Sequence, residues 1–234
     1  MAAAKVRPPP GPLTFPRGRF TLWRCPKCPV FAAPATTGMR ERHTREGAML
    51  LPGNGVTAHR GDSAHVPENT LPAFAAGNSS GADWLELDVH QTADGHLVVC
   101  HDASTGRTGD RDLIIADSPI DLLRSLDMST RFRREHPGVA VGQTSMPLLS
   151  EVLELVLKER RARLSIQPKV ACVPQIARLI LDLGAEAWVG FNDGDLAILT
   201  EARKLLPEAA IFYDTPPGPL ALDQHIRTAQ EQGF

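Results

Sequence analysis

The sequence lacks several features that would place it in common functional classes. No apolar run approaches the roughly 18 to 20 residues needed to span a bilayer, and prolines interrupt the N-terminal stretch where the apolar part of a signal peptide would lie. Lys and Arg number 25 against 27 Asp and Glu, so no basic excess favours nucleic acid or an anionic membrane surface. We therefore expect a cytoplasmic protein whose partner is a small molecule.

Cysteines are few, and the common nucleotide-binding motifs are missing. Cys100 and Cys172 lie in apolar contexts, so a disulfide framework is not expected. Cys25 and Cys28 form a CxxC pair, but with His43 as the only nearby extra ligand, a zinc site is disfavoured. Neither GxGxxG nor GxxxxGK[ST] follows the first expected strand, which leaves the usual nucleotide-binding folds unsupported.

Two regions of the chain differ in composition. Residues 1–54 are rich in Pro, Gly, Arg and Ala without helical or strand periodicity, which predicts a flexible N-terminal extension. Met49 is a candidate natural start, because the composition changes just after it. Residues 55–234 alternate short apolar runs with helical patterns, which predicts one α/β domain with a parallel sheet.

The expected elements suggest a particular α/β architecture. Apolar and β-branched runs predict six strands, at residues 56–59, 84–89, 97–101, 164–167, 187–191 and 210–213. Helical patterns lie between most of them, at residues 67–80, 148–161, 174–183, 194–206 and 220–232. Polar residues follow several strands, as they do at the active-site face of a TIM (β/α)8 barrel. A closed barrel needs eight strands, so we expect a TIM barrel that is incomplete at its C-terminus.

The segment WLELDV carries two carboxylates on one side of a strand. Glu86 and Asp88 are two residues apart and therefore share a face, whereas Leu85 and Leu87 share the other. Adjacent carboxylates repel each other unless a cation lies between them, which predicts a site for Mg²⁺ or Ca²⁺. The alternative is a solvent-facing strand, but both faces of a strand are usually covered in an α/β fold.

Two histidines follow apolar strands in equivalent ways. His59 ends VTAH and His101 ends LVVCH, and as a pair they could supply a general acid and a general base. Arg60 is suited to binding phosphate through its planar set of donors. The basic stretch at residues 131–136 is expected to be a solvated loop. The other histidines are expected at the surface: His43, His65, His90, His96, His136 and His225.

The order of the motifs HRG, PENT, LPAF, GADWLELDVHQTADGHLVVCHD, GRT and MPLLSEVLELV, over residues 55–213, resembles the glycerophosphodiester phosphodiesterase family. The resemblance implies a TIM barrel that uses a divalent metal to hydrolyse glycerophosphodiesters to sn-glycerol 3-phosphate and an alcohol. By matching positions, His59 and His101 resemble the general acid and base, and Glu86 and Asp88 resemble metal ligands. Arg60 and Lys169 resemble phosphate-binding residues, and Glu68 and Asn69 resemble substrate-site loop residues.

The sequence departs from the family pattern at two places. Gln167 stands where the family usually has a glutamate as third metal ligand, and a glutamine oxygen can still bind Mg²⁺ or Ca²⁺ but adds no charge. The chain also ends before the last two barrel strands. An open barrel exposes unpaired strand edges, so we expect either a fragment or an oligomer that covers the open edge.

Two alternatives to glycerophosphodiester hydrolysis remain at this point. A phospholipase-D-like lyase acting on lysophospholipid or sphingomyelin headgroups would use the same histidines and metal. A catalytically silent domain is the second alternative, suggested by Gln167 and by the early end of the chain. The headgroup of the substrate and the physiological metal do not follow from the sequence.

Overall fold

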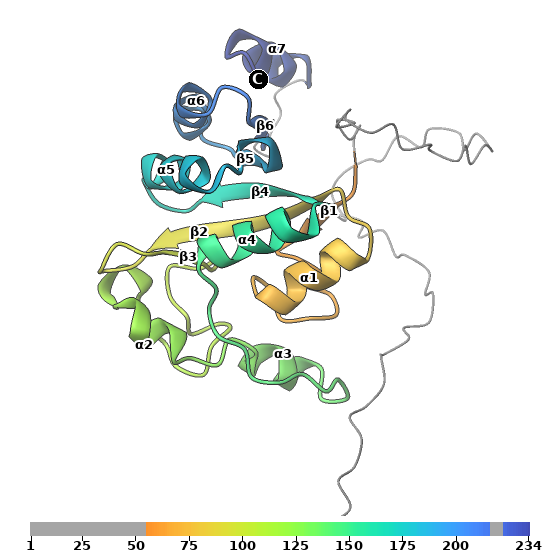
Figure 1. Cartoon of the computed structure of the whole chain (residues 1–234), viewed down its shortest axis with the longest axis vertical. Helices are drawn as coiled ribbons and strands as arrows, with labels where there is room; N and C mark the ends of the chain where they lie inside the picture. Colours follow the sequence, from red (N-terminus) through yellow and green to blue (C-terminus); the bar gives the residue numbers. More distant parts are fainter. Residues whose placement is uncertain (1–54, 216–221) are drawn as a thin grey trace, which may run out of the picture. The chain divides into compact units, whose positions relative to one another are not determined.

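The computed structural model describes residues 55–215 and 222–234. Its sheet has five parallel strands in the order β1-β2-β4-β5-β6, and β3 pairs with β2 outside this path (Figure 1). The strands are β1 Thr57–His59, β2 Trp84–Gln91, β3 Leu97–Val99, β4 Arg163–Pro168, β5 Val189–Asp193 and β6 Ala210–Tyr213. The fold is of the TIM-barrel type, and the described residues contain five of the eight parallel strands of such a barrel.

Helices connect the parallel strands. They are α1 Leu71–Ser79, α2 Ile120–Arg124, α3 Thr130–Glu135, α4 Leu149–Glu159, α5 Val173–Leu183, α6 Leu196–Leu205 and α7 Leu222–Glu231, with 3-10 turns at Ile115–Asp117 and Glu186–Trp188. Helix α1 contacts α4, α4 contacts α5 and α5 contacts α6, so these four helices form a layer against the sheet (Figure 1). Each of the five expected helices is present, with its ends shifted by a few residues.

The faces of the parallel strands differ in polarity. Leu85 and Leu87 of β2 are fully buried in the main hydrophobic core, with the helices. Each such side chain contributes about 1.5 to 3 kcal/mol to folding. Trp84, Glu86 and Asp88 share the opposite face, because side chains alternate along a strand. The helix-facing side of the sheet thus provides stability, and the other side carries the polar groups.

Strand β3 differs from the expectation. We expected residues 97–101 to form one more barrel strand, whereas Leu97–Val99 runs antiparallel to the end of β2. Only a few residues join the two strands, too few for the crossover that parallel pairing requires, and Gly95 N closes the turn on Thr92 O at 3.0 Å. The described residues thus contain the six strands that the sequence predicted, but only five of them are parallel.

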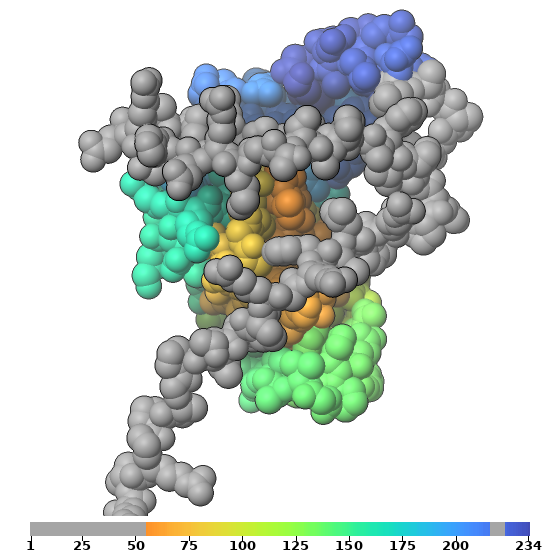
Figure 2. Space-filling model, turned by 90° about the vertical axis from the view of Figure 1, so that its right-hand side faces the viewer, coloured from red at the N-terminus to blue at the C-terminus, as the bar shows by residue number. Residues whose placement is uncertain are grey.

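The segment between β3 and α4 forms a second, smaller core. Its buried members are Val98, Cys100, Ile115, Ile120, Leu123, Leu126, Met128 and Met146. Residues 131–136, expected to be a loop, mostly belong to helix α3, because Phe132 is buried and Arg133 forms an ion pair with Asp127. The residues of α3 gather at one end of the space-filling view (green in Figure 2).

Two histidines expected at the surface are buried. His90 is 5% exposed and its Nε2 lies 3.2 Å from the backbone oxygen of His101, because β2 is covered on both faces. His225 is 8% exposed and packs near the ring of Tyr213. His65 is exposed, as expected.

Other expectations are tested only in part. Cys100 and Cys172 are buried free thiols. The CxxC pair, His43 and Met49 lie outside the described residues, as does the whole expected extension. Among residues 55–215 and 222–234, no helix combines the length and apolar character that a bilayer crossing requires.

Candidate active site

The HRG motif forms a tight turn at the carboxyl end of β1. Arg60 has a φ of 57° and Gly61 a φ of 77°, so both adopt the left-handed conformation. A Cβ on Gly61 would lie 2.5 Å from the backbone carbon of Ala73 in α1, so only glycine allows this close approach. For Arg60 the conformation costs on the order of 1 kcal/mol, and such strain concentrates at functional sites.

Arg60 joins the HRG turn to the PENT turn and to strand β2. Its Nη1 donates to Glu68 Oε1 at 2.9 Å, and its Nε lies 3.4 Å from Asp88 Oδ2. Its backbone N donates to Glu86 Oε2 at 3.1 Å, and its backbone O accepts from the N of Asn69 at 3.0 Å. The guanidinium group is therefore fixed beside two carboxylates, and the backbone of Arg60 contacts a third.

Glu86 and Asp88 lie side by side on β2, as the sequence predicted, and both are buried. Burial first, and then the negative charge of Asp88, raises the pKa of Glu86 to about 7. Asp88 Oδ2 accepts a hydrogen bond of 2.9 Å from Asn69 Nδ2. Asn69 Oδ1 is buried without a hydrogen-bond partner among the described residues. The two carboxylates thus share a site that favours added positive charge.

Strand β4 brings Gln167 and Lys169 to the carboxylate pair. Gln167 is the register partner of Asp88 across the parallel β2–β4 ladder. Lys169 Nζ lies 2.9 Å from Asp88 Oδ1 and also donates to Gln167 Oε1. The ammonium group partly neutralises Asp88, and Gln167 adds an oxygen atom without adding charge.

His101 is held by a chain of polar contacts that starts at its own neighbour. Its Nδ1 lies 2.5 Å from Asp102 Oδ1, and Arg107 Nε donates to Asp102 Oδ2. Arg107 also donates two hydrogen bonds of 2.7 Å, one to each carboxylate oxygen of Glu68. Because Glu68 also binds Arg60, one network connects the phosphate-binding candidate to the histidine.

The two acids of this network are ionised. Burial alone would raise the pKa of Glu68, but the hydrogen bonds and charge of Arg107, together with Arg60, outweigh burial and lower it. The pKa of Asp102 is also lowered, because hydrogen bonds from Arg107 and His101 outweigh its partial burial. An ionised Asp102 accepts a hydrogen bond from His101 Nδ1–H, which favours the tautomer of the neutral ring whose Nε2 carries no proton.

His59 lies on the other side of the carboxylates. Its Nε2 is 3.8 Å from Glu86 Oε2, and its side chain is 66% exposed. The inner part of the ring is desolvated, and this together with the charge of Arg60 lowers the pKa of His59. The charges of Asp88 and Glu68 act in the opposite direction on the pKa of His59 but do not outweigh burial and Arg60.

Of the residues described above, His59, Glu86 and Gln167 line a cavity of about 410 Å³ on the polar face of the parallel strands. Arg60, Asp88, His101 and Lys169 are not among its lining residues. Strands β1 and β2 contribute Thr57, His59 and Glu86 to its lining. The β4–β6 side contributes Ser165, Gln167, Asn192, Phe212 and Asp214. Sequence reasoning missed Ser165, Asn192, Phe212 and Asp214, together with the link through Arg107. The period-two alternation of β4 to β6 was the signal that could have found the missed lining residues.

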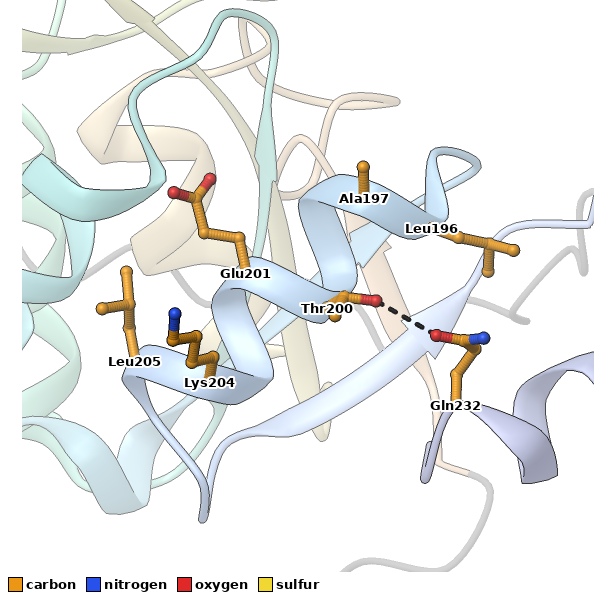
Figure 3. A pocket seen from close by; sticks show the side chains of 7 residues that line it. All are labelled: Leu196, Ala197, Thr200, Glu201, Lys204, Leu205 and Gln232. Carbon is orange, nitrogen blue, oxygen red and sulfur yellow. Dashed lines mark hydrogen bonds between the residues drawn. The ribbon is translucent and has the colours of Figure 1, made fainter.

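A larger hollow, of about 590 Å³, lies on the surface of α6 (Figure 3). Thr200 and Gln232 meet there in a hydrogen bond of 3.3 Å, and Glu201 and Lys204 point from the helix (Figure 3). None of the strand-end residues of the smaller cavity lines it. We therefore assign the candidate active site to the smaller cavity.

The donor atoms of the site suit a hard divalent cation. Glu86, Asp88, Asn69 and Gln167 offer only oxygen, which is the donor type that Mg²⁺ and Ca²⁺ prefer. The buried Asn69 Oδ1 and Asp88 Oδ1 accept no hydrogen bond of good geometry among the described residues. In that part of the chain no three acidic, histidine or cysteine residues cluster as a metal site. The residues fit a weakly held cation.

Comparisons with known proteins agree on one family. The model of the glycerophosphoryl diester phosphodiesterase family matches residues 59–179, just over half of the chain. A glycerophosphodiester phosphodiesterase of Bacillus altitudinis is 40% identical over 188 residues, covering 76% of this chain and 74% of the relative. One of Caldanaerobacter subterraneus subsp. tengcongensis is 33% identical over 161 residues, and the match spans 67% of this chain and 64% of that protein's length.

The fold is also similar to that of a solved structure. It is an Oleispira antarctica phosphodiesterase in complex with the product sn-glycerol-3-phosphate, 26% identical, with a TM-score of 0.61. The match covers 75% of this chain and 71% of the solved one. The matched segment contains most of the network described above, from His59 to Lys169. The chain therefore belongs to the glycerophosphoryl diester phosphodiesterase family.

Proposed function

We propose that this protein hydrolyses glycerophosphodiesters to sn-glycerol 3-phosphate and an alcohol. The observation that carries the proposal is that His59 and Glu86 line one cavity, and that Arg60 links Glu86 to the network that holds His101. Family membership supports the same reaction class. These groups together supply what phosphodiester cleavage needs, namely proton transfer in two directions and neutralisation of the phosphate charge.

His101 is the general base in this proposal. Asp102 holds the Nδ1 proton, so Nε2 is free to take the proton of the attacking hydroxyl, from water or from the substrate glycerol. As that oxygen bonds to phosphorus, the bond from phosphorus to the leaving alcohol oxygen breaks. Attack by water gives sn-glycerol 3-phosphate directly, whereas attack by the glycerol hydroxyl gives a cyclic phosphate that water then opens to the same product. Asp102 also stabilises the positive charge that His101 gains.

His59 is the general acid. Its lowered pKa makes the protonated ring a ready donor to the departing oxygen, which leaves as the neutral alcohol. Arg60 and Lys169 bind the phosphate oxygens and offset their charge. A divalent cation held by Glu86, Asp88, Asn69 and Gln167 would supply further neutralisation of the phosphate.

One assay tests the proposal directly. The purified chain is incubated with glycerophosphocholine and glycerophosphoethanolamine, with Mg²⁺, Ca²⁺ or a chelator, and release of sn-glycerol 3-phosphate and alcohol is measured. We expect release that the chelator reduces and an added cation restores. Release from a lysophospholipid but not from the water-soluble diesters would favour a headgroup lyase instead. No release from any substrate under any cation condition would identify a silent domain.

A further inference from the structure

The β5–β6 side of the cavity contains groups that the proposed chemistry does not use. Phe212 and Asp214 are two residues apart at the end of β6 and both line the cavity. Asn192 of β5 donates from Nδ2 to Asp214 Oδ2 at 3.1 Å and accepts from Ser165 Oγ at 2.8 Å. This ladder fixes the Asp214 carboxylate at the edge of the cavity.

The ladder ends in a region of negative charge. Asp193 accepts a hydrogen bond of 2.7 Å from the N of Asp195, and Asp195 caps α6 by accepting one of 2.8 Å from the N of Ala197. These two acids therefore have structural roles. Asp214 has no such role, and within the described residues none of the three acids forms an ion pair with Lys or Arg. Asp214 is thus a carboxylate available to a ligand.

Phe212 adds an aromatic surface beside this carboxylate. Its ring packs edge-to-face on Trp84, with the ring centroids 4.9 Å apart, yet the residue remains 38% exposed. Gly190 of β5 lies directly beneath, because a Cβ there would come within 3.1 Å of the ring. The ring is therefore held in place with part of its surface open. An aromatic face attracts an ammonium group, and a nearby carboxylate strengthens that attraction.

We propose that Phe212 and Asp214, positioned by Asn192, form a subsite for an alcohol headgroup that carries an ammonium group, such as ethanolamine or choline. The proposal rests on the proposed hydrolysis and names its substrate class. The charge pattern of the cavity supports it. Arg60 contacts Glu86 and Lys169 contacts Gln167, so positive charge lies next to the β2–β4 wall of the cavity, and Asp214 lines the β6 wall. This pattern complements a zwitterionic diester.

The test compares a cationic with a neutral headgroup. The kcat/KM for glycerophosphocholine is divided by that for glycerophosphoglycerol, in the wild type, in Asp214→Asn and in Glu208→Gln. Glu208 precedes the opposite end of β6 and is exposed, so Glu208→Gln removes the same charge away from the cavity. We expect the wild type to prefer the cationic diester, and Asp214→Asn to lower the ratio about three- to tenfold, in line with a single partly exposed charge contact. Glu208→Gln should leave the ratio unchanged.

A binding measurement separates failure of this subsite from failure of the proposed hydrolysis. Equilibrium dialysis of both diesters on chelator-treated wild type and Asp214→Asn reports headgroup preference without turnover. Preferential binding of glycerophosphocholine that weakens in Asp214→Asn supports the subsite even if no product is formed. Equal preference in wild type and Asp214→Asn, in both binding and kcat/KM, overturns it. Phe212→Leu, which keeps an apolar side chain, should lower the same ratio if the aromatic ring takes part.

Discussion

The two sides of the cavity are built in different ways. On the β1–β3 side, charged groups contact one another directly, as in the chain that runs from Glu68 through Arg107 to Asp102. On the β4–β6 side, hydrogen bonds connect Ser165 to Asn192 and Asn192 to the carboxylate of Asp214, and no ion pair takes part in this ladder. A charged network fixes proton positions and local charge, whereas a ladder without ion pairs fixes shape. We therefore assign proton transfer to the first side and the choice of substrate to the second, while Lys169 after β4 binds the phosphate.

The largest expected effect comes from removing a histidine on the charged side. His101→Ala and His59→Ala should each lower kcat for glycerophosphocholine by about 10²- to 10⁴-fold, because each removes a proton-transfer group. Circular dichroism should show an unchanged fold. His65→Ala is the matched control, because His65 is exposed and close in sequence to His59. Undiminished rates in either active-site variant would refute the assigned roles.

The next effect concerns stability rather than turnover. Without metal, the pKa of Glu86 is about 7 in the folded protein and near the ordinary glutamate pKa of 4.5 when the protein is unfolded. The stability that Glu86 contributes as a protonated group is therefore present below pH 4.5 and is lost as the pH rises to 7. Glu86→Gln should raise the free energy of unfolding by up to about 3 kcal/mol at pH 8, and hardly at pH 4.

Urea denaturation in the presence of chelator measures this difference at both pH values. Glu154→Gln on α4 is the control, because Glu154 is exposed. An equal change in the free energy of unfolding at pH 4 and pH 8 would show that ionisation of Glu86 beside Asp88 does not destabilise the protein.

A smaller effect on kcat distinguishes the chain of Glu68, Arg107 and Asp102 from an ordinary ion pair. Arg107 and Arg124 each make two hydrogen bonds to a glutamate, but only Arg107 reaches Asp102 and thus His101. Arg107→Ala should lower kcat about 10- to 100-fold, Arg107→Lys should restore part of it, and Arg124→Ala should leave kcat unchanged. Steady-state kinetics with glycerophosphocholine measures all three. If Arg107→Ala altered only the melting temperature, its role would be purely structural.

The smallest expected effect is on metal affinity, when a carboxylate is added to the β4–β6 side. Gln167→Glu places a carboxylate beside Asp88, where Lys169 already lies, and should tighten Mg²⁺ binding about tenfold. Calorimetric titration without substrate measures the dissociation constant. Gln175→Glu, at an exposed position of α5, adds the same charge elsewhere as a control. An unchanged titration of Gln167→Glu would exclude this position as a ligand.

The sequence predicted the charged side well because that side is compact along the chain. HRG, PENT and WLELDV are short motifs, and strand alternation alone put Glu86 and Asp88 together. His101 was chosen for a reason that the structure corrects. His101 lies near β2 because the β3 hairpin returns along that strand, with Cys100 N donating to Asp88 O at 3.0 Å, and not because a barrel strand ends there.

The residues of the β4–β6 side were missed because they are far apart along the sequence. Ser165, Asn192 and Asp214 lie far apart in sequence, and each looks like an ordinary polar residue at a strand end. Only the parallel register of β4, β5 and β6 brings them into line. The burial of His90 was missed for a related reason, since it depends on the hairpin that covers β2. Contacts set by tertiary pairing leave no local motif.

The short hairpin of β2 and β3 has a consequence for how such a chain can diversify. Val99 N donates to Pro147 O at 2.9 Å and Val98 bridges to Leu148, so the segment with α2 and α3 leaves and rejoins the domain at one place. That segment has an apolar cluster of its own. The part of this segment beyond Arg107 could therefore be exchanged for other sequences, provided that Asp102 and Arg107, which hold His101, are kept.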